Sequence, residues 1–223
     1  MDIFYPDIYY PINRGMTMAA RVIWAHRLLA LMLGLFITAH LLGHLAALHS
    51  IAAQDAVLET LRRVYRAPWV EPFLLGGFAV QIAIGLRLVW RRMAEKQKSI
   101  WSWLQILSGL YLALFVALHA SAAVWARWQY DLDTDFYWPA GTLVLSPLKY
   151  GFAPYYFFGI VSVFIHLAAA LHFAGVVRWP KILIGAGVLL AIALLAAFSG
   201  QLHSIELPES HKDYYTAYPG VDP

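Results

Sequence analysis

The segment from Arg21 to Ser50 reads RVIWAHRLLALMLGLFITAHLLGHLAALHS, and it decides what kind of fold the chain can adopt. It is apolar over more than the roughly 20 residues that a helix needs to cross a bilayer. Four histidines interrupt it, His26, His40, His44 and His49. Polar side chains at membrane depth are costly and usually serve a function. We therefore expect a transmembrane helix whose histidines bind a metal-containing group.

The composition of the whole chain agrees with an integral membrane protein. Of its 223 residues, 61% are hydrophobic and only 13% are charged, a balance outside the range of soluble domains. Further apolar segments are long enough to span a bilayer, and they lack the alternating pattern of barrel strands. The expected spans are residues 22–48, 69–92, 101–126, 152–176 and 181–202. The predicted fold class is therefore all-α, a bundle of five transmembrane helices, with no cleaved signal peptide before it.

The polar segments outside the spans set the expected topology. Residues 1–21 form an N-terminal segment, and residues 203–223 form a proline-containing tail that we predict to be an extended outer arm. Basic residues favour the cytoplasmic side of a membrane. They occur before the first span and in the connections that follow the second and fourth spans: Arg14, Arg21, Arg91, Arg92, Lys96, Lys98, Arg178 and Lys181. We therefore expect the N-terminus inside and the C-terminus outside, and we assign the positive net charge to membrane orientation, not to nucleic-acid binding.

Two connections lie on the expected outer side. The loop between the first two spans carries arginines as well, which opposes the orientation above. The connection from residue 127 to residue 151 is long, acidic and aromatic, and we expect a partly ordered cap. Asp131, Asp133 and Asp135 have the spacing that begins a calcium loop, but Phe136 stands where an EF-hand has glycine, so we predict a solvated acidic turn. We expect three histidines to be solvent-exposed at or beyond this surface: His49, His203 and His211.

A weak internal repeat relates the first and third spans. His26 and His40 are separated by 14 residues, and Gln105 and His119 have the same separation. Fourteen residues of helix return to within roughly 40° of the same face. Both helices run in one direction, so we expect His40 and His119 at equal depth in the outer half of the bundle.

Two imidazoles at equal depth across a helical bundle suit bis-histidine ligation of haem b. Small residues beside them leave room for the flat ring: Ala39, Gly43, Ala117, Ala120 and Ser121. We assign His44, one turn after His40, to a contact with a haem propionate or to an interface, not to zinc binding. In the alternative interpretation, each histidine hydrogen-bonds a carbonyl one turn away in a packed core.

A second site is expected in the inner half of the bundle. There Gln81 of the second span faces His166 of the fourth, and glutamine is a poor ligand for haem iron. A second haem would need another donor, of which His26 is the first candidate. Arg27 and Arg87 either extend to the membrane surface or line a cavity that receives a quinone carbonyl or a haem propionate.

The chain contains no cysteine. This excludes disulfides, thiolate-held iron–sulfur clusters and covalent c-type haem attachment within it. Any redox centre of the chain must therefore be held by histidine or another non-thiolate ligand.

At these residues the chain resembles the five-helix, single-subunit cytochrome b anchors of succinate:quinone oxidoreductases, the succinate dehydrogenases and fumarate reductases. The resemblance extends from Val22 to Gly200, and it rests on AHRLL, on the run from QILSG to His119, and on IVSVFIHL. In that family the first and third helices ligate a distal haem, and the second and fourth a proximal one. The resemblance implies that His40 and His119 are the distal pair and His166 one proximal ligand. Gln81 departs from the dihaem pattern, which implies a one-haem member.

The resemblance also implies a role and partners. The chain would be a non-catalytic anchor and electron-transfer subunit of the bacterial inner membrane, surrounded by membrane lipid. A flavoprotein with FAD and an iron–sulfur subunit would dock on its inner face, and haem b would relay electrons between them and membrane quinone. The sequence leaves open whether such complexes form a homotrimer.

Two other functions remain possible on the sequence. One is a haem b electron carrier of a different membrane redox complex with an outer-face partner. The other is a structural or assembly subunit whose histidines are only hydrogen-bonded. A stand-alone enzyme is not expected, because the membrane segments contain no nucleophile–base pair or carboxylate dyad.

Overall fold

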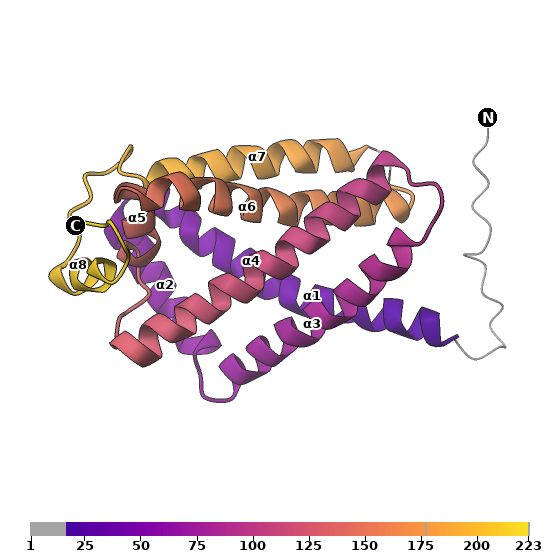
Figure 1. Cartoon of the computed structure of the whole chain (residues 1–223), viewed down its shortest axis with the longest axis horizontal. Helices are drawn as coiled ribbons and strands as arrows, with labels where there is room; N and C mark the ends of the chain where they lie inside the picture. The colour runs from indigo at the N-terminus through magenta and orange to yellow at the C-terminus, as the bar shows by residue number, and fades with distance from the viewer. Residues whose placement is uncertain (1–16, 177, 223) are drawn as a thin grey trace.

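The computed structural model describes residues 17–176 and 178–222, and within these ranges it contains helices and no strand (Figure 1). Its long helices are α1 (Met18–Leu45), α3 (Val70–Met93), α4 (Ile100–Tyr130), α6 (Leu148–Phe173) and α7 (Trp179–Phe198). Each is long and apolar enough to cross a membrane, and the short helix η1 (Ala46–Leu48) prolongs the first. The predicted all-α membrane bundle with five spans is confirmed. Most of the predicted N-terminal segment, residues 1–21, lies outside the described residues.

The outward faces of the long helices fit a lipid environment. Large apolar side chains such as Leu31 and Leu35 of α1 are exposed, at 71% and 76%. The side chains of α3 are all exposed or half-buried. Since hydrocarbon is as apolar as leucine, such faces need no protein cover within a bilayer. Close packing concentrates where α6 meets α7 and α4, and where α3 meets α4.

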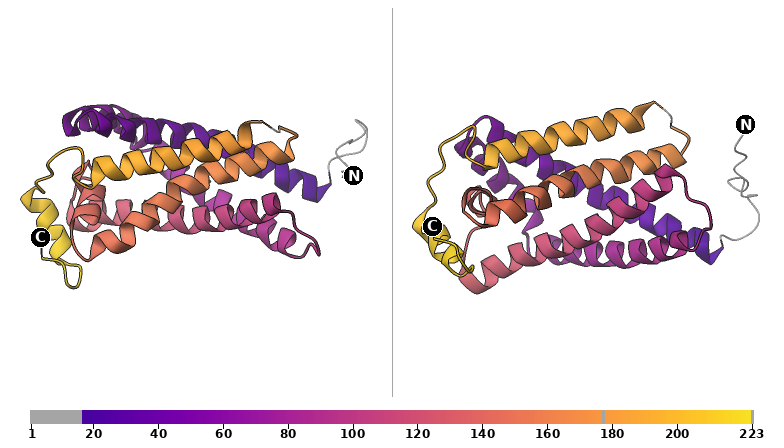
Figure 2. Two further views of the ribbon diagram at one scale, coloured as in Figure 1. Left: turned by 90° about the horizontal axis from the view of Figure 1, so that it is seen from above. Right: turned by 45° about the horizontal axis from the view of Figure 1, so that its top comes forward.

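Three short helices gather at the end of the bundle opposite the start of α1, as the views in Figures 1 and 2 agree. They are α2 (Ile51–Tyr65), α5 (Tyr137–Val144) and α8 (Glu209–Thr216). We call these helices, together with residues 131–136, the cap. Most of the buried apolar residues lie in two clusters at this end, built around Phe136 and Phe198 in one and Trp138 and Tyr215 in the other.

Helix α2 replaces the loop expected between the first two spans. The side-chain oxygen of Ser50 accepts the N–H of Ala53 at 3.0 Å and so caps its first turn. Gln54, Leu58 and Arg62 then follow at four-residue intervals and are buried on one face. The segment is an amphipathic helix whose buried face carries polar groups. Its hydrophobicity alone therefore does not indicate a helix.

The tail is not the extended arm that the sequence predicted. Residues 209–216 form α8, and Tyr215 is fully buried within it. The Tyr215 ring lies directly over Gly141 of α5, and its O–H donates to the carbonyl of Trp138. Any side chain at Gly141 would collide with that ring. The tail therefore folds back and closes the cap.

Asp131 and Asp133 of the acidic turn are exposed, as predicted, but Asp133 and Asp135 also bind neighbouring helices. Asp133 accepts hydrogen bonds from Arg62 at 3.0 Å and Arg66 at 3.3 Å, although over half of its side chain is exposed. Asp135 accepts the N–H of Tyr137 at 2.8 Å and lies 3.0 Å from Nε2 of His211. These contacts attach the connection between α4 and α5 to both α2 and α8.

The three histidines predicted to be solvent-exposed have different surroundings. His49 is exposed, as predicted. His203 is half-buried, with Nε2 2.8 Å from the carbonyl oxygen of Ala47. His211 is buried, with 3% of its surface exposed, so the prediction is wrong for this residue because α8 was not foreseen.

Candidate cofactor site between two histidine helices

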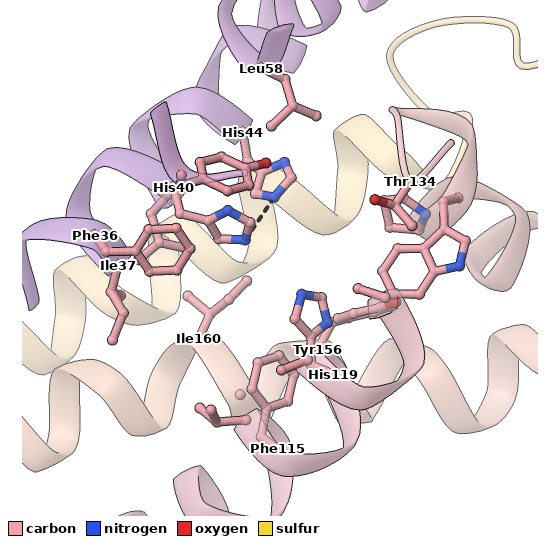
Figure 3. A pocket seen from close by; sticks show the side chains of 18 of the residues that line it. Phe36, Ile37, His40, His44, Leu58, Phe115, His119, Thr134, Tyr156 and Ile160 are labelled. Atoms are coloured by element: carbon pink, nitrogen blue, oxygen red, sulfur yellow. Dashed lines mark hydrogen bonds between the residues drawn. The ribbon is translucent and has the colours of Figure 1, made fainter. Parts of the chain in front are cut away.

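A cavity of about 250 Å³ lies inside the bundle, next to the cap. Its wall is mostly aliphatic and aromatic, and it includes three histidines. Figure 3 shows His40 and His44 of α1 on one side and His119 of α4 on the other. Sites for drug-sized ligands span roughly 300–1,000 Å³. A ligand as large as a haem therefore requires side chains at the partly open mouth to move outward.

The structure brings the predicted pair His40 and His119 together. Their ring centroids are 6.2 Å apart, with 69° between the ring planes. Two imidazoles on opposite sides of one metal ion have a similar separation, because each metal–nitrogen bond is about 2 Å and the nitrogen lies roughly 1 Å from the ring centre. The equal depth inferred from the repeat agrees with this geometry.

Each of the two imidazoles stacks on a phenylalanine one helical turn earlier. Phe36 stacks on His40 with centroids 5.6 Å apart and planes at 22°. Phe115 stacks on His119 with centroids 5.3 Å apart and planes at 8°. Both phenylalanines occupy equivalent places in the internal repeat. Neither phenylalanine was predicted to belong to the site. The repeat does contain the signal, because each phenylalanine lies four residues before its histidine.

Gly159 of α6 makes room for one of these phenylalanines. A Cβ atom at this position would lie 2.5 Å from Cδ2 and 2.8 Å from Cζ of Phe115. Tyr155 holds the same turn of α4, since its O–H donates to the carbonyl of Phe115 at 3.1 Å. The place of His119 therefore depends on a close contact between α4 and α6.

The two histidines retain unused hydrogen-bonding capacity. Nδ1 of His40 and Nδ1 of His119 are buried, and neither has a hydrogen-bond partner within residues 17–176 and 178–222. Leaving a buried polar atom unpaired costs about 1–3 kcal/mol. An imidazole that borders a cavity can bind a metal through Nε2 while Nδ1 carries the proton.

Charged side chains line the cavity where it meets the cap. They are Arg66, Glu71, Arg127 and Asp135. Arg127 of α4 pairs with Glu71 of α3, and Arg66 donates to Asp133 and, at 2.5 Å, to Thr134 Oγ1. A guanidinium has five N–H donors, so both arginines keep donors for a carboxylate that enters the cavity.

His44 contacts both His40 and the cap. Its Nε2 lies 3.2 Å from Nε2 of His40, the contact dashed in Figure 3. Its Nδ1 lies 3.4 Å from the amide nitrogen of Gln54 of α2. Phe198 of α7 meets its ring edge to face, with centroids 5.4 Å apart. The structure thus places His44 in the wall of the cavity.

The residues of the predicted second site form two separate pairs. Gln81 Nε2 lies 3.5 Å from Nε2 of His26, where α3 meets α1. Ser108 Oγ lies 3.2 Å from Nδ1 of His166, where α4 meets α6. The His166 ring also occupies the space beside Gly109, whose Cβ position is 3.1 Å from Cε1 of that ring. His26 and His166 are therefore each engaged on a neighbouring helix.

Other predicted members of the inner site lie elsewhere. Arg27 and Arg87 are exposed on the surface of α1 and α3. Gln105, the repeat counterpart of His26, accepts a hydrogen bond from Arg92.

In the described part of the chain, no group of three or more His, Cys, Asp or Glu residues is arranged to hold a metal ion. A haem needs only two protein ligands, because the porphyrin supplies the others. The paired histidines, the apolar wall and the arginines at the cap together fit a haem better than an ion held by side chains alone. Comparison with protein-family models, curated proteins and solved structures finds no match for the chain.

Proposed function

We propose that this multi-pass membrane protein binds one haem b and carries electrons as the membrane anchor of a redox complex. The observation that carries the proposal is the pair His40 and His119, 6.2 Å apart across an apolar cavity. A bound haem would supply one-electron chemistry. The chain's own residues would hold it, orient it and keep water from it.

The residues have distinct roles in this proposal. His40 and His119 are the axial ligands, and Phe36 and Phe115 hold their rings by stacking. Arg66 and Arg127 receive the propionates, since charge-assisted hydrogen bonds from arginine to carboxylate are strong and directional. Both arginines lie where the cavity meets the cap, so they would hold the propionates at that side.

One haem is favoured over two. His26 is paired with Gln81 where α1 meets α3, and His166 with Ser108 where α4 meets α6, so the inner histidines do not form a pair across one cavity as His40 and His119 do. Glutamine in place of a second ligand supports the same conclusion. We assign these four residues to a polar contact between helices.

The resemblance to the succinate:quinone oxidoreductase anchors supports a particular complex. A flavoprotein with FAD and an iron–sulfur subunit would bind at the end opposite the cap, where α3 and α4 are joined by a segment with Lys96 and Lys98. Membrane quinone would exchange electrons with the haem. The N-terminus would lie in the cytoplasm of a bacterium, and the cap outside.

A second function is favoured by one observation. The cavity and its charged residues lie next to the cap, so the haem would be nearer to a partner on that face. A haem b carrier that serves an outer-face partner would use this geometry. Copurification of a flavin and iron–sulfur pair with the chain supports the first function, and its absence together with a cap-binding partner supports the second.

The first test is a reduced-minus-oxidised spectrum of the purified chain, with pyridine haemochrome quantitation. We expect one haem b per chain in the wild type and none in His119→Ala. His49→Ala is the matched control, because His49 is exposed and outside the cavity. A wild-type protein without haem, or a His119→Ala variant with full haem, would refute the proposal.

A further inference from the structure

We infer that α1 carries two alternative axial ligands for the haem iron, with His44 able to take the place of His40. This inference rests on the proposed function. It assigns His44 a direct bond to the metal, in contrast to the propionate or interface role expected from the sequence.

The two histidines of α1 reach nearly the same point in the cavity. Residues four apart in a helix lie on one face, one turn above the other. Nε2 of His44 and Nε2 of His40 are 3.2 Å apart, and both side chains line the cavity that His119 borders. A displacement of about this size brings the nitrogen of His44 to the present position of the His40 nitrogen.

The two nitrogens cannot both bind iron while they are hydrogen-bonded to each other. A hydrogen bond between them needs one N–H donor and one lone pair. Ligation through Nε2 uses the lone pair of whichever histidine binds iron, so the contact between the two Nε2 atoms breaks and the other ring turns aside. The pair is therefore exclusive, and only one member serves as ligand at a time.

Gln54 supplies what a ligating His44 requires. A histidine that binds a metal through one nitrogen usually donates its other N–H to an oxygen atom. Gln54 is fully buried beside Nδ1 of His44, and its Oε1 is unpaired among the described residues. Turning the amide over presents Oε1 to an Nδ1–H of His44. The same amide can thus serve His44 as a hydrogen-bond donor when His40 is the ligand, or as an acceptor when His44 is.

Helix α4 carries no second histidine one turn after His119. In the internal repeat, the position that corresponds to His44 is Ala123, four residues after His119, and Ala123 also lines the cavity. The inference therefore predicts an asymmetry. His119 is indispensable for haem binding, whereas His40 is replaceable.

The test compares haem content and spectra in full-length variants purified in detergent. We expect His40→Ala and His44→Ala each to retain at least half of the wild-type haem. The double variant should fall to the level of His119→Ala. The haem retained by His40→Ala should show altered low-spin electron paramagnetic resonance and a shifted midpoint potential, because its ligand has moved by one turn.

Two further variants separate the loss of an iron ligand from a folding defect. His40→Gln keeps a hydrogen-bonding group against His44 and should retain haem as His40→Ala does. Gln54→Leu should leave the haem content of the wild type unchanged and lower it in the His40→Ala background. Helical content by circular dichroism and elution in size exclusion establish that each variant is folded.

The outcomes separate this inference from the proposed function. A wild-type protein without haem overturns the proposed function itself. Haem in the wild type, combined with folded His40→Ala and His40→Gln variants as empty as His119→Ala, overturns only the role of His44.

Discussion

Replacing Gly159 by alanine tests whether the contact between α4 and α6 holds His119 in place. The new Cβ would lie 2.5 Å from Cδ2 of Phe115, whereas ordinary contacts begin near 3.4 Å. The ring must therefore move by about 1 Å. Phe115 stacks on His119 on one side and packs against Tyr155 on another, with that centroid distance at 4.7 Å. The displacement is thus transmitted to the imidazole.

The expected cost follows from core packing. Inserting a methyl group into a well-packed interior typically costs about 1–3 kcal/mol, and the helix preference of alanine over glycine returns at most about 1 kcal/mol. We expect a lower midpoint of thermal unfolding in detergent, measured by scanning fluorimetry. We also expect a reduced haem content, measured by pyridine haemochrome.

A matched glycine in the same bundle provides the control. At Gly185 of α7, no atom of the described residues lies within 4 Å of a Cβ position. Gly185→Ala should be neutral or slightly stabilising, because only the helix preference acts. The double variant Gly159→Ala/Phe115→Leu should recover stability, since the smaller side chain leaves room for the methyl group. If Gly159→Ala unfolds at the same temperature as Gly185→Ala and keeps its haem, the reasoning is wrong.

Three further predictions concern the cap. Arg62→Met should lower stability by about 1–3 kcal/mol, because it leaves the carbonyl of Thr134 without its charged donor and Asp133 with Arg66 as its remaining partner. Arg63→Met, which breaks only the exposed pair with Glu59, should change stability by less than about 1 kcal/mol in the same denaturation assay. Burial raises the pKa of Asp55 above its ordinary 3.8, so the folded state loses stability as the pH rises through that raised pKa. Asp55→Asn should therefore raise the unfolding temperature at pH 7 but not below pH 3.8, and an equal gain at both would contradict this explanation. Tyr215→Phe removes the hydrogen bond to Trp138, worth about 1 kcal/mol, and should speed proteolysis between α7 and α8; an unchanged cleavage rate would show that ring packing alone holds α8.

The spans and the histidine pair could be predicted from the sequence because both signals are local or periodic. Twenty or more apolar residues identify a spanning helix whatever its neighbours are. The 14-residue spacing within the first and third spans was enough to place His40 and His119 at one depth. Neither inference needed knowledge of how the helices pack.

The cap could not be predicted because distant contacts fix it. Arg62 and Asp133 are 71 residues apart in the chain, and only the folded bundle brings them together. The polar residues of α2 suggest an exposed loop when they are considered alone. Likewise α8 is a short polar helix that gains its stability by packing Tyr215 on Gly141, and short isolated helices are marginal in water.

The position of α8 in the chain has a consequence for biogenesis. This helix follows all five spans, so the ribosome delivers it only after the bundle has been synthesised. Tyr215 then binds the carbonyl of Trp138, whose ring lies 5.6 Å from that of His119. Tyr214 and Tyr218 of the same tail line a small pocket that His119 and Trp138 also border. The surroundings of His119 on this side are therefore completed last, after all five spans have been made.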